Sequence, residues 1–246
     1  MGKRGRFDYS RRAVLGFAGA VALATTLRTM DALAQATGGK MRIGVIGSGH
    51  IGSTIGGLWV KAGHPVLFSS RHPEELKELV AGLGPLAQNG TVQQAIAFGD
   101  ALLIAVPYGA LPQIGQEYSD ILKGKIMLDA CNAVPARDGA VADEVERDGI
   151  GIASQKYLPG TRLVRAFNTL SYMIFAREAN RPDPKLAVPI AGDDSEALTV
   201  AAGLVRDAGF EPVVVGPLAK AKMFDVGTPV YTQLLTAREL RARLGM

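Results

Sequence analysis

The sequence has little of what several common classes of protein require. Its 246 residues include one cysteine and three histidines, and aromatic residues make up only 6%. With one cysteine, no disulfide can form within the chain, so the fold must depend on its hydrophobic core. The histidines have no spacing typical of metal ligands, so no metal site is predicted. A hydrophobic fraction of 48% excludes a disordered or collagen-like chain and indicates a globular protein.

An excess of one charge is also missing from most of the chain. The net charge of +4 arises within residues 1–34, which hold six basic and two acidic residues. The remaining 212 residues hold 21 of each sign. A nucleic-acid-binding domain usually has a basic surface, so we expect no nucleic-acid partner.

Residues 1–34 have the order of features of an export signal. A basic start is followed by the apolar stretch 13–27 and by Ala32-Leu33-Ala34, a small-x-small cleavage site. Fifteen helical residues span about 22 Å, less than the roughly 30 Å of a bilayer core, so no permanent membrane span is predicted. Arg11-Arg12 resembles a twin-arginine (Tat) motif, which implies export by the Tat machinery to the periplasm. The alternative is an ordinary amphipathic N-terminal helix.

From residue 41 onward, short apolar runs alternate with segments of helical periodicity. This alternation predicts an α/β fold with a Rossmann-type, doubly wound, mostly parallel sheet over residues 41–217. A short helical C-terminal segment, 218–246, is expected to follow, with four leucines on one amphipathic face. Strands are expected at 41–47, 65–69, 86–87, 101–106, 125–129, 162–167, 186–191 and 211–215; helices at 50–62, 74–83, 92–98 and 195–208; and the leucines are Leu234, Leu235, Leu240 and Leu244.

A glycine-rich motif lies between the first expected strand and the first expected helix. Its residues are Gly47, Ser48, Gly49, His50, Ile51 and Gly52, a G-x-G-x-x-G pattern in the context of a dinucleotide site. The first glycine suits the tight turn, the second allows close approach of a pyrophosphate, and the third allows the helix to press against the strand. Amides at the helix start can then donate to the phosphates. The alternative is a glycine-rich turn without a ligand.

The end of the second expected strand indicates which dinucleotide is bound. NAD-specific proteins usually carry Asp or Glu there, but this chain has Ser69-Ser70-Arg71-His72 and no carboxylate before Glu74. Arg71 can pair bidentately with a 2′-phosphate, and the serine hydroxyls can donate to it. We therefore predict NADP(H), the alternative being that Arg71 is an ordinary surface residue. His72 is equally suited to stacking on adenine or to capping the next helix.

Together with these residues, further short motifs give the sequence a family resemblance. It resembles the NADP-dependent coenzyme F420 oxidoreductase family, whose dinucleotide domain also occurs in eukaryotic membrane metalloreductases. The combination of an F-N-T motif with a later A-G-D-D motif carries most of this resemblance. The motifs are Gly47, Gly49 and Gly52; Ser69-Ser70-Arg71; Ala105-Val106-Pro107; Asp129-Ala130-Cys131-Asn132; Val164-Arg165-Ala166-Phe167-Asn168-Thr169; Ala191-Gly192-Asp193-Asp194; and Gly209-Phe210 before Val215-Gly216-Pro217-Leu218.

The resemblance implies a cofactor, a reaction and the surroundings of the nicotinamide. The cofactor is NADPH, and a deazaflavin (coenzyme F420) or flavin takes its hydride. Val106-Pro107 would run along the nicotinamide ribose, and Asn132 would lie near the switch point of the sheet. Asn168 either orients a ring edge or caps a local turn. The resemblance also implies dimerisation through the C-terminal segment.

Hydride transfer between two rings depends mainly on positioning, so it needs no strong general acid. Asn132 and Asn168 are therefore the positioning candidates, and no catalytic residue is assigned. Cys131 is expected to be a buried core thiol, a redox role being the alternative.

The expected function is an NADPH-dependent oxidoreductase whose acceptor is coenzyme F420, a flavin or a similar small electron carrier. One alternative is an exported NADP(H)-binding module without turnover. Another is a reductase of the β-hydroxyacid dehydrogenase type, but this needs a helical second domain with a catalytic lysine. The 29 residues after Pro217 are too few for that domain.

Overall fold

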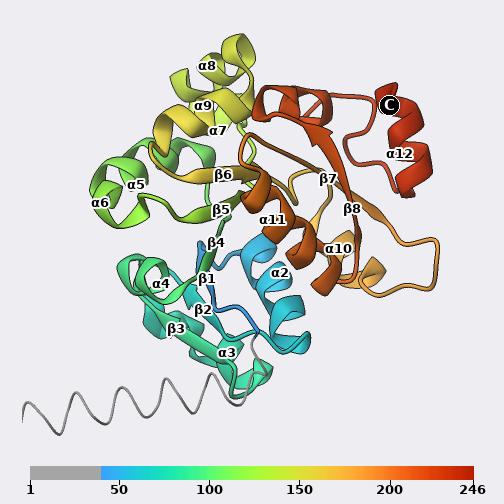
Figure 1. Ribbon diagram of the computed structural model, residues 1–246. Helices are drawn as coiled ribbons and strands as arrows, with labels where there is room; N and C mark the ends of the chain where they lie inside the picture. The colour runs from blue at the N-terminus through green and yellow to red at the C-terminus, as the bar shows by residue number, and fades with distance from the viewer. Residues whose placement is uncertain (1–39) are drawn as a thin grey trace, which may run out of the picture. The chain divides into compact units, whose positions relative to one another are not determined.

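The computed structural model describes residues 40–246 (Figure 1), so the predicted export signal lies outside the described residues. In this described part, no helix combines the length and the apolar character needed to cross a membrane.

Eight strands form one sheet, in the order β3-β2-β1-β4-β5-β6-β7-β8. Every neighbouring pair is parallel except β6 and β7, which are antiparallel. The chain proceeds outward from β1 in both directions, so the switch point lies between β1 and β4. The predicted Rossmann-type, mostly parallel sheet is confirmed. The strands are β1 (Ile43–Ile46), β2 (Val66–Ser69), β3 (Ala87–Gly90), β4 (Ala101–Ile104), β5 (Ile126–Asp129), β6 (Arg162–Arg165), β7 (Ala187–Gly192) and β8 (Glu211–Gly216).

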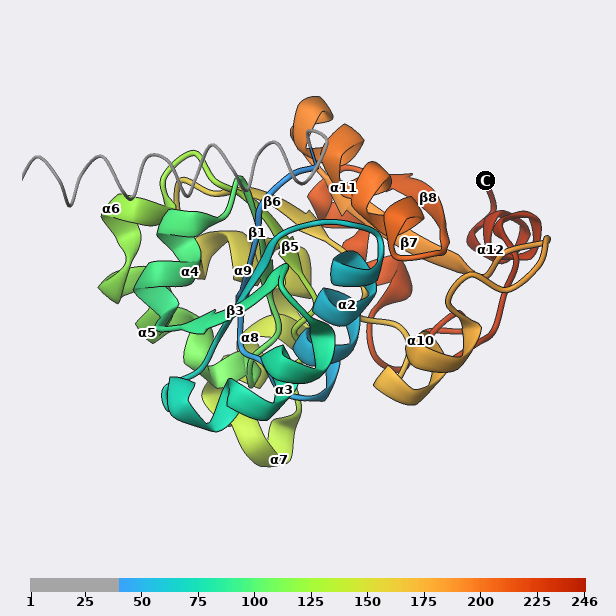
Figure 2. The same ribbon diagram turned by 90° about the horizontal axis from the view of Figure 1, so that it is seen from below.

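Helices cover both faces of the sheet, as Figure 2 shows most clearly. On one face, Trp59, Phe175 and Val205 belong to a single buried cluster, and the Trp59 ring nitrogen donates to the carbonyl of Leu204 at 2.7 Å. On the other face, Ile96 and Ile150 belong to a second cluster. The helices are α2 (His50–Lys61), η1 (Pro73–Leu76), α3 (Lys77–Leu83), α4 (Val92–Phe98), η2 (Tyr108–Ala110), α5 (Leu111–Glu117), α6 (Ser119–Leu122), α7 (Pro135–Asp138), α8 (Ala140–Asp148), α9 (Ile150–Tyr157), α10 (Tyr172–Glu178), α11 (Ser195–Asp207), η3 (Leu218–Phe224) and α12 (Ala237–Leu244).

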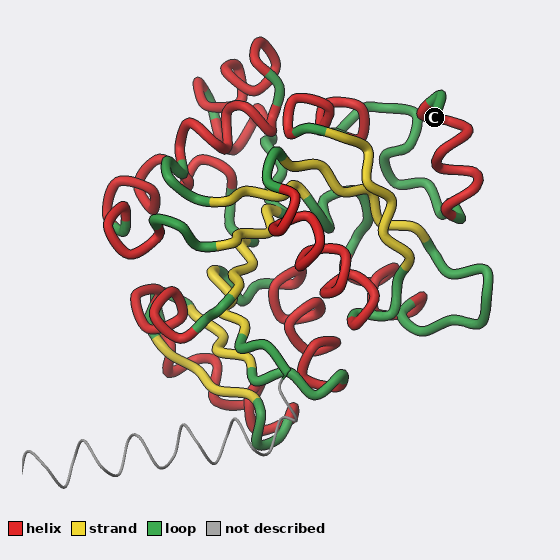
Figure 3. The backbone as a smooth tube through the Cα atoms, viewed as in Figure 1, coloured by secondary structure: helices red, strands yellow, loops and turns green. Residues whose placement is uncertain are grey.

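The C-terminal segment, residues 218–246, differs from the predicted helical segment with four leucines on one amphipathic face. Residues 225–236 are irregular, and a helix begins only at α12 (Figure 3). Thr236 forms a capping box with Glu239, which fixes the start of this helix. Leu240 is buried, whereas Leu234 precedes the helix and is 44% exposed. Leu235 also precedes α12, so the predicted face of four leucines was wrong for Leu234 and Leu235.

Candidate functional site

The glycine motif forms the turn between β1 and α2. Gly47 has a φ of +92°, and a side chain there would come within 2.6 Å of the Ala105 carbonyl oxygen. A side chain at Gly52 would come within 2.0 Å of the Gly47 carbonyl oxygen, so α2 approaches the turn closely. Gly49 instead faces open space, and no side chain caps the start of α2. The free amides at this helix start suit an anion.

The other three residues of the motif have side chains that are engaged within the protein. Ser48 donates its hydroxyl to the carbonyl of Ser69 at 3.1 Å, which links the turn to the end of β2. The ring of His50 stacks on Tyr172 at the start of α10, with 4.3 Å between ring centres. Ile51 packs against the core. These three residues therefore present backbone amides rather than side chains to a ligand.

The three residues predicted to bind the 2′-phosphate, at the end of β2, do not share one environment. Ser69 is fully buried and donates its hydroxyl to the carbonyl of Val45 at 2.8 Å, so it does not face the surface as predicted. All four side chains of β2 are buried, because the sheet is covered on both faces at this strand. Ser70 and Arg71 follow the strand, and Arg71 is exposed. Among residues 40–246, the Arg71 guanidinium forms no salt bridge, so its charge is available to a phosphate.

Val106 and Pro107 follow β4, next to the glycine turn. A side chain at Gly47 would approach Val106 within 2.6 Å, and the Val106 amide lies 3.4 Å from the sulfur of Cys131. Cys131 is 2% exposed, and burial raises the pKa of its thiol well above the usual value. A thiol held in its neutral form is a packing group rather than a nucleophile.

The two candidate asparagines meet at the ends of β5 and β6. The side-chain amide of Asn132 donates to the carbonyl of Asn168 at 2.8 Å. Asn168 is 2% exposed, and its own amide donates to the carbonyl of Phe224 at 3.1 Å. Asn168 thus joins the sheet to η3 and does not project toward a ligand. Asn132 is only partly buried and remains the better positioning candidate.

A buried ionic cluster at the ends of β5 and β6 contacts Asn132. The side chains of Arg165 and Asp129 are both fully buried, and Arg165 Nη1 lies 3.1 Å from Asp129 Oδ1. Arg165 Nη2 donates to Asn132 Oδ1 at 2.7 Å and lies 3.7 Å from Asp225 Oδ1. Burial raises the pKa of Asp225 to about 6. The guanidinium of Arg165, at the end of β6, thus holds the side chain of Asn132 through this hydrogen bond.

Sequence reasoning assigned no role to this cluster or to Phe167. The motifs quoted for the resemblance contain Arg165, Asp129 and Phe167, but they do not show that the two charges are buried together. An arginine beside the apolar residues of β6 was the available signal. Phe167 has a φ of +58°, which is unusual for an aromatic residue, and its ring packs edge-on against Trp59 and Phe175. This packing holds the turn that leads from β6 to Asn168.

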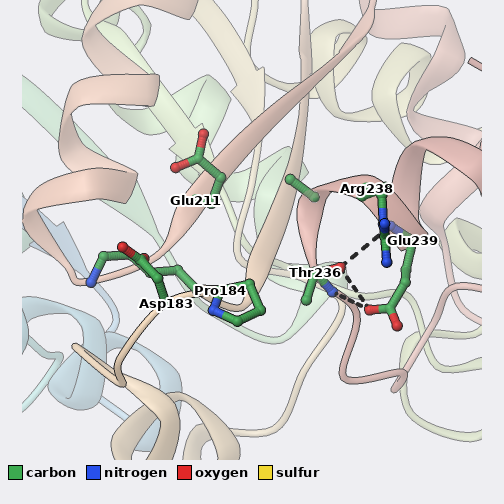
Figure 4. A pocket seen from close by; sticks show the side chains of 8 residues that line it. Asp183, Pro184, Glu211, Thr236, Arg238 and Glu239 are labelled. Carbon is green, nitrogen blue, oxygen red and sulfur yellow. Dashed lines mark hydrogen bonds between the residues drawn. The ribbon is translucent and has the colours of Figure 1, made fainter.

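A separate groove lies at the outer end of the sheet, where the loop around Asp183 and Pro184, the start of β8 and the start of α12 meet (Figure 4). Glu211, Arg238 and Glu239 line it, so its charges are mixed. β8 lies five strand spacings from β1, about 24 Å at 4.8 Å each. The groove is too far from the glycine turn to belong to a dinucleotide site.

Comparison with known proteins identifies similar chains. Residues 42–133 match the family model described as NADP oxidoreductase, coenzyme F420-dependent. A stretch of 189 residues, 74% of this chain, is 30% identical to the metalloreductase STEAP3 of Rattus norvegicus. The match covers 35% of that protein, so this chain spans about a third of its length.

Two solved structures share the architecture. A hypothetical protein from Sinorhizobium meliloti superposes with a TM-score of 0.67 at 27% identity, over 80% of this chain and 95% of the other. A proposed F420-dependent NADP reductase from Arthrobacter sp. FB24 superposes with a TM-score of 0.63 at 22% identity, over 74% and 87%. The chain has the fold of the NADP-binding reductases. Residues 42–133, which match the NADP oxidoreductase model, include the glycine turn and Arg71.

Proposed function

We propose that the protein is an NADPH-dependent oxidoreductase that transfers a hydride between NADP(H) and coenzyme F420, a flavin or a similar small electron carrier. The observation that carries this proposal is an open, uncapped helix start at Gly49 together with the exposed Arg71 at the end of β2, which forms no salt bridge within residues 40–246. The first suits a pyrophosphate, and the second suits a 2′-phosphate. The similarity of residues 42–133 to NADP oxidoreductases supports the same cofactor.

The residues present fit NADP(H) along the carboxyl ends of β2, β1, β4 and β5. Backbone amides of residues 47–52 would hold the pyrophosphate, and Ser70 and Arg71 would hold the 2′-phosphate. Val106 and Pro107 would line the nicotinamide ribose, and Asn132 would lie beyond them. When bound, NADPH supplies the hydride. The protein supplies position and a partly dry surface, the main requirements for hydride transfer.

The first experiment tests turnover. Purified protein is mixed with NADPH, and its oxidation is followed optically with coenzyme F420, FMN and a ferric chelate in turn. Oxidation that depends on one of these acceptors supports the proposal. Tight NADPH binding without oxidation by any acceptor would favour the exported binding module instead.

The second experiment tests the choice of nucleotide. The Arg71→Ala variant should bind NADPH at least tenfold more weakly and NADH almost unchanged, because the lost guanidinium contacts only the 2′-phosphate. Arg206→Ala is the matched control, since Arg206 is an exposed arginine near the end of α11. Equal losses for NADPH and NADH would remove Arg71 from the phosphate site.

We also propose that the protein is exported by the Tat pathway with NADP(H) already bound. The motif Arg11-Arg12 and the net charge confined to residues 1–34 support this. Changing both arginines to lysine should retain the protein in the cytoplasm, as cell fractionation would show. An unchanged periplasmic fraction would contradict the Tat route.

A further inference from the structure

Tyr231 is brought to the candidate site by the irregular segment between η3 and α12. The amide of Thr232 donates to the carbonyl of Thr169 at 2.8 Å, so this segment is fastened to the loop after β6. The Tyr231 hydroxyl lies 3.4 Å from the side-chain amide of Asn132, although the two residues are 99 positions apart. A half-buried phenol therefore lies at the carboxyl ends of β5 and β6.

The surroundings of Asn132 determine which way this hydrogen bond runs. Arg165 donates to Asn132 Oδ1, so Asn132 Nδ2 is the atom that faces Tyr231. This amide is a donor only, and the Tyr231 oxygen must accept from it. Within the described residues, the Tyr231 hydroxyl has no other hydrogen-bond partner. Its own hydrogen is thus free to be donated to a ligand.

A continuous series of contacts links Tyr231 to the glycine turn. Gly47 adjoins Val106, the Val106 amide faces Cys131, and Asn132 follows directly. Arg71 lies on the other side of this series, at the end of β2. A dinucleotide whose 2′-phosphate is held by Arg71 would extend across the turn, and its nicotinamide would lie toward Val106 and Asn132. Tyr231 would then lie on the side where the acceptor must approach.

We propose that Tyr231 is a catalytic residue whose hydroxyl donates a hydrogen bond to a ring carbonyl of the acceptor, and that Asn132 is the positioning residue that holds it. This inference rests on the function proposed above. The hydride that NADPH supplies carries two electrons to the acceptor ring, whose conjugated carbonyl bears the added negative charge until a proton from water neutralises it. A preoriented donor at that carbonyl stabilises the developing charge.

The test compares two variants that each remove one phenol hydroxyl. Tyr231→Phe should lower kcat about tenfold and weaken FMN binding to the NADP⁺-loaded protein several-fold, as measured by fluorescence quenching. Its affinity for NADP⁺ and its Tm should stay unchanged. Tyr118→Phe, at a half-buried tyrosine between α5 and α6, should change none of these values.

Two outcomes would overturn the inference, and they can be told apart. If the wild type reduces an acceptor and Tyr231→Phe matches it in kcat and FMN affinity, the role of Tyr231 fails while the proposed function stands. If the wild type reduces no acceptor, both fail together.

A further variant tests the positioning role of Asn132. Asn132→Asp keeps an oxygen for Arg165 but replaces the amide, which donates to both Asn168 and Tyr231, by a second oxygen that would accept the Tyr231 hydrogen. Its kcat should fall as far as that of Tyr231→Phe, and the double variant should fall no further. Losses that multiply in the double variant would show that Asn132 does not act through Tyr231.

Discussion

Two arginines of the same strand have opposite surroundings. Arg162, at the start of β6, forms a bidentate pair with Asp194, both N···O distances being 2.7 Å, and contacts Glu196 at 2.8 Å. Its side chain is 28% exposed. Arg165, at the end of β6, is fully buried, and its Nε has no hydrogen-bond acceptor. The surface arginine is thus paired with two carboxylates, whereas the buried arginine has a nitrogen without an acceptor.

The difference follows from position on the strand. Residues three apart point to opposite faces of a sheet, and these two also lie at opposite ends of β6. At the amino end, Asp194 both pairs with Arg162 and caps α11, so the contact serves the fold. At the carboxyl end, Arg165 holds Asn132, so the contact serves the candidate site. Proteins often keep such incompletely satisfied groups where function requires them.

Unpaired polar atoms reinforce this contrast. Across residues 40–246, buried side-chain oxygens and nitrogens without a hydrogen-bond partner occur only in the Arg165 cluster and its neighbour Asn168. They belong to Asp129, Arg165, Asn168 and Asp225. Each such atom costs roughly 1–3 kcal/mol. We therefore expect these unpaired atoms to lower the free energy of unfolding, while the cluster holds Asn132 in a fixed orientation.

The largest effect is expected from removing the buried charge. Arg165→Met leaves Asp129 buried without its cation, which should lower the free energy of unfolding by about 3–5 kcal/mol. Arg162→Met is the matched control on the same strand. Urea denaturation followed by circular dichroism measures both. Equal losses from the two variants would contradict the contrast between the two ends of β6.

The sequence was sufficient to predict the parallel sheet and its glycine turn, because both depend on local patterns. Helix α4 has the bounds that its periodicity indicated, and β1 breaks at glycine where the motif required it. The helices over 108–122 and 135–157 were not predicted. The latter stretch is interrupted by Gly139 and Gly149, both at positive φ, so no long periodic run marks it.

The site was harder to predict because it depends on contacts between distant segments. Arg165 meets Asp129 and Asn132, which are 36 and 33 residues away, and Tyr231 meets Asn132 across 99 residues. Neither burial nor hydrogen-bond direction can be seen in a single short motif. Ser69 shows the same limit, since a serine at the end of a strand can face either a ligand or the core.

A smaller effect is expected at Asp225. Its raised pKa of about 6 means that the folded protein holds a proton that the unfolded chain, with an ordinary Asp pKa near 4, has lost. This contribution to stability is fully present below about pH 4 and is lost as the pH rises through about 6. Asp225→Asn should therefore be more stable than the wild type by roughly 3 kcal/mol above pH 7. Thermal unfolding across pH 4–8 measures the difference.

The difference in stability between the wild type and Asp225→Asn must change between about pH 4 and pH 6. Their difference in Tm should grow from pH 4 to pH 6 and stay constant above it. A constant difference at all pH values would show that Asp225 is not the titrating group. Asp148→Asn is a suitable control, because Asp148 pairs with Arg147 at the surface.

The smallest effect is expected at the surface pair of β6. Arg162 holds the pKa of Asp194 well below its ordinary value through its bidentate hydrogen bonds. The resulting stability is present above the unfolded pKa near 4 and is lost as the pH falls through the lower, folded pKa. Arg162→Met should therefore lower the Tm by no more than about 2–4 °C at pH 7, as surface pairs contribute little. The loss should shrink in high salt and disappear in strong acid, because screening and protonation of Asp194 remove the same attraction. In 1 M salt, charges are screened beyond about 3 Å. A loss of Tm that persists there would show that the aliphatic part of the Arg162 side chain stabilises the protein by packing instead.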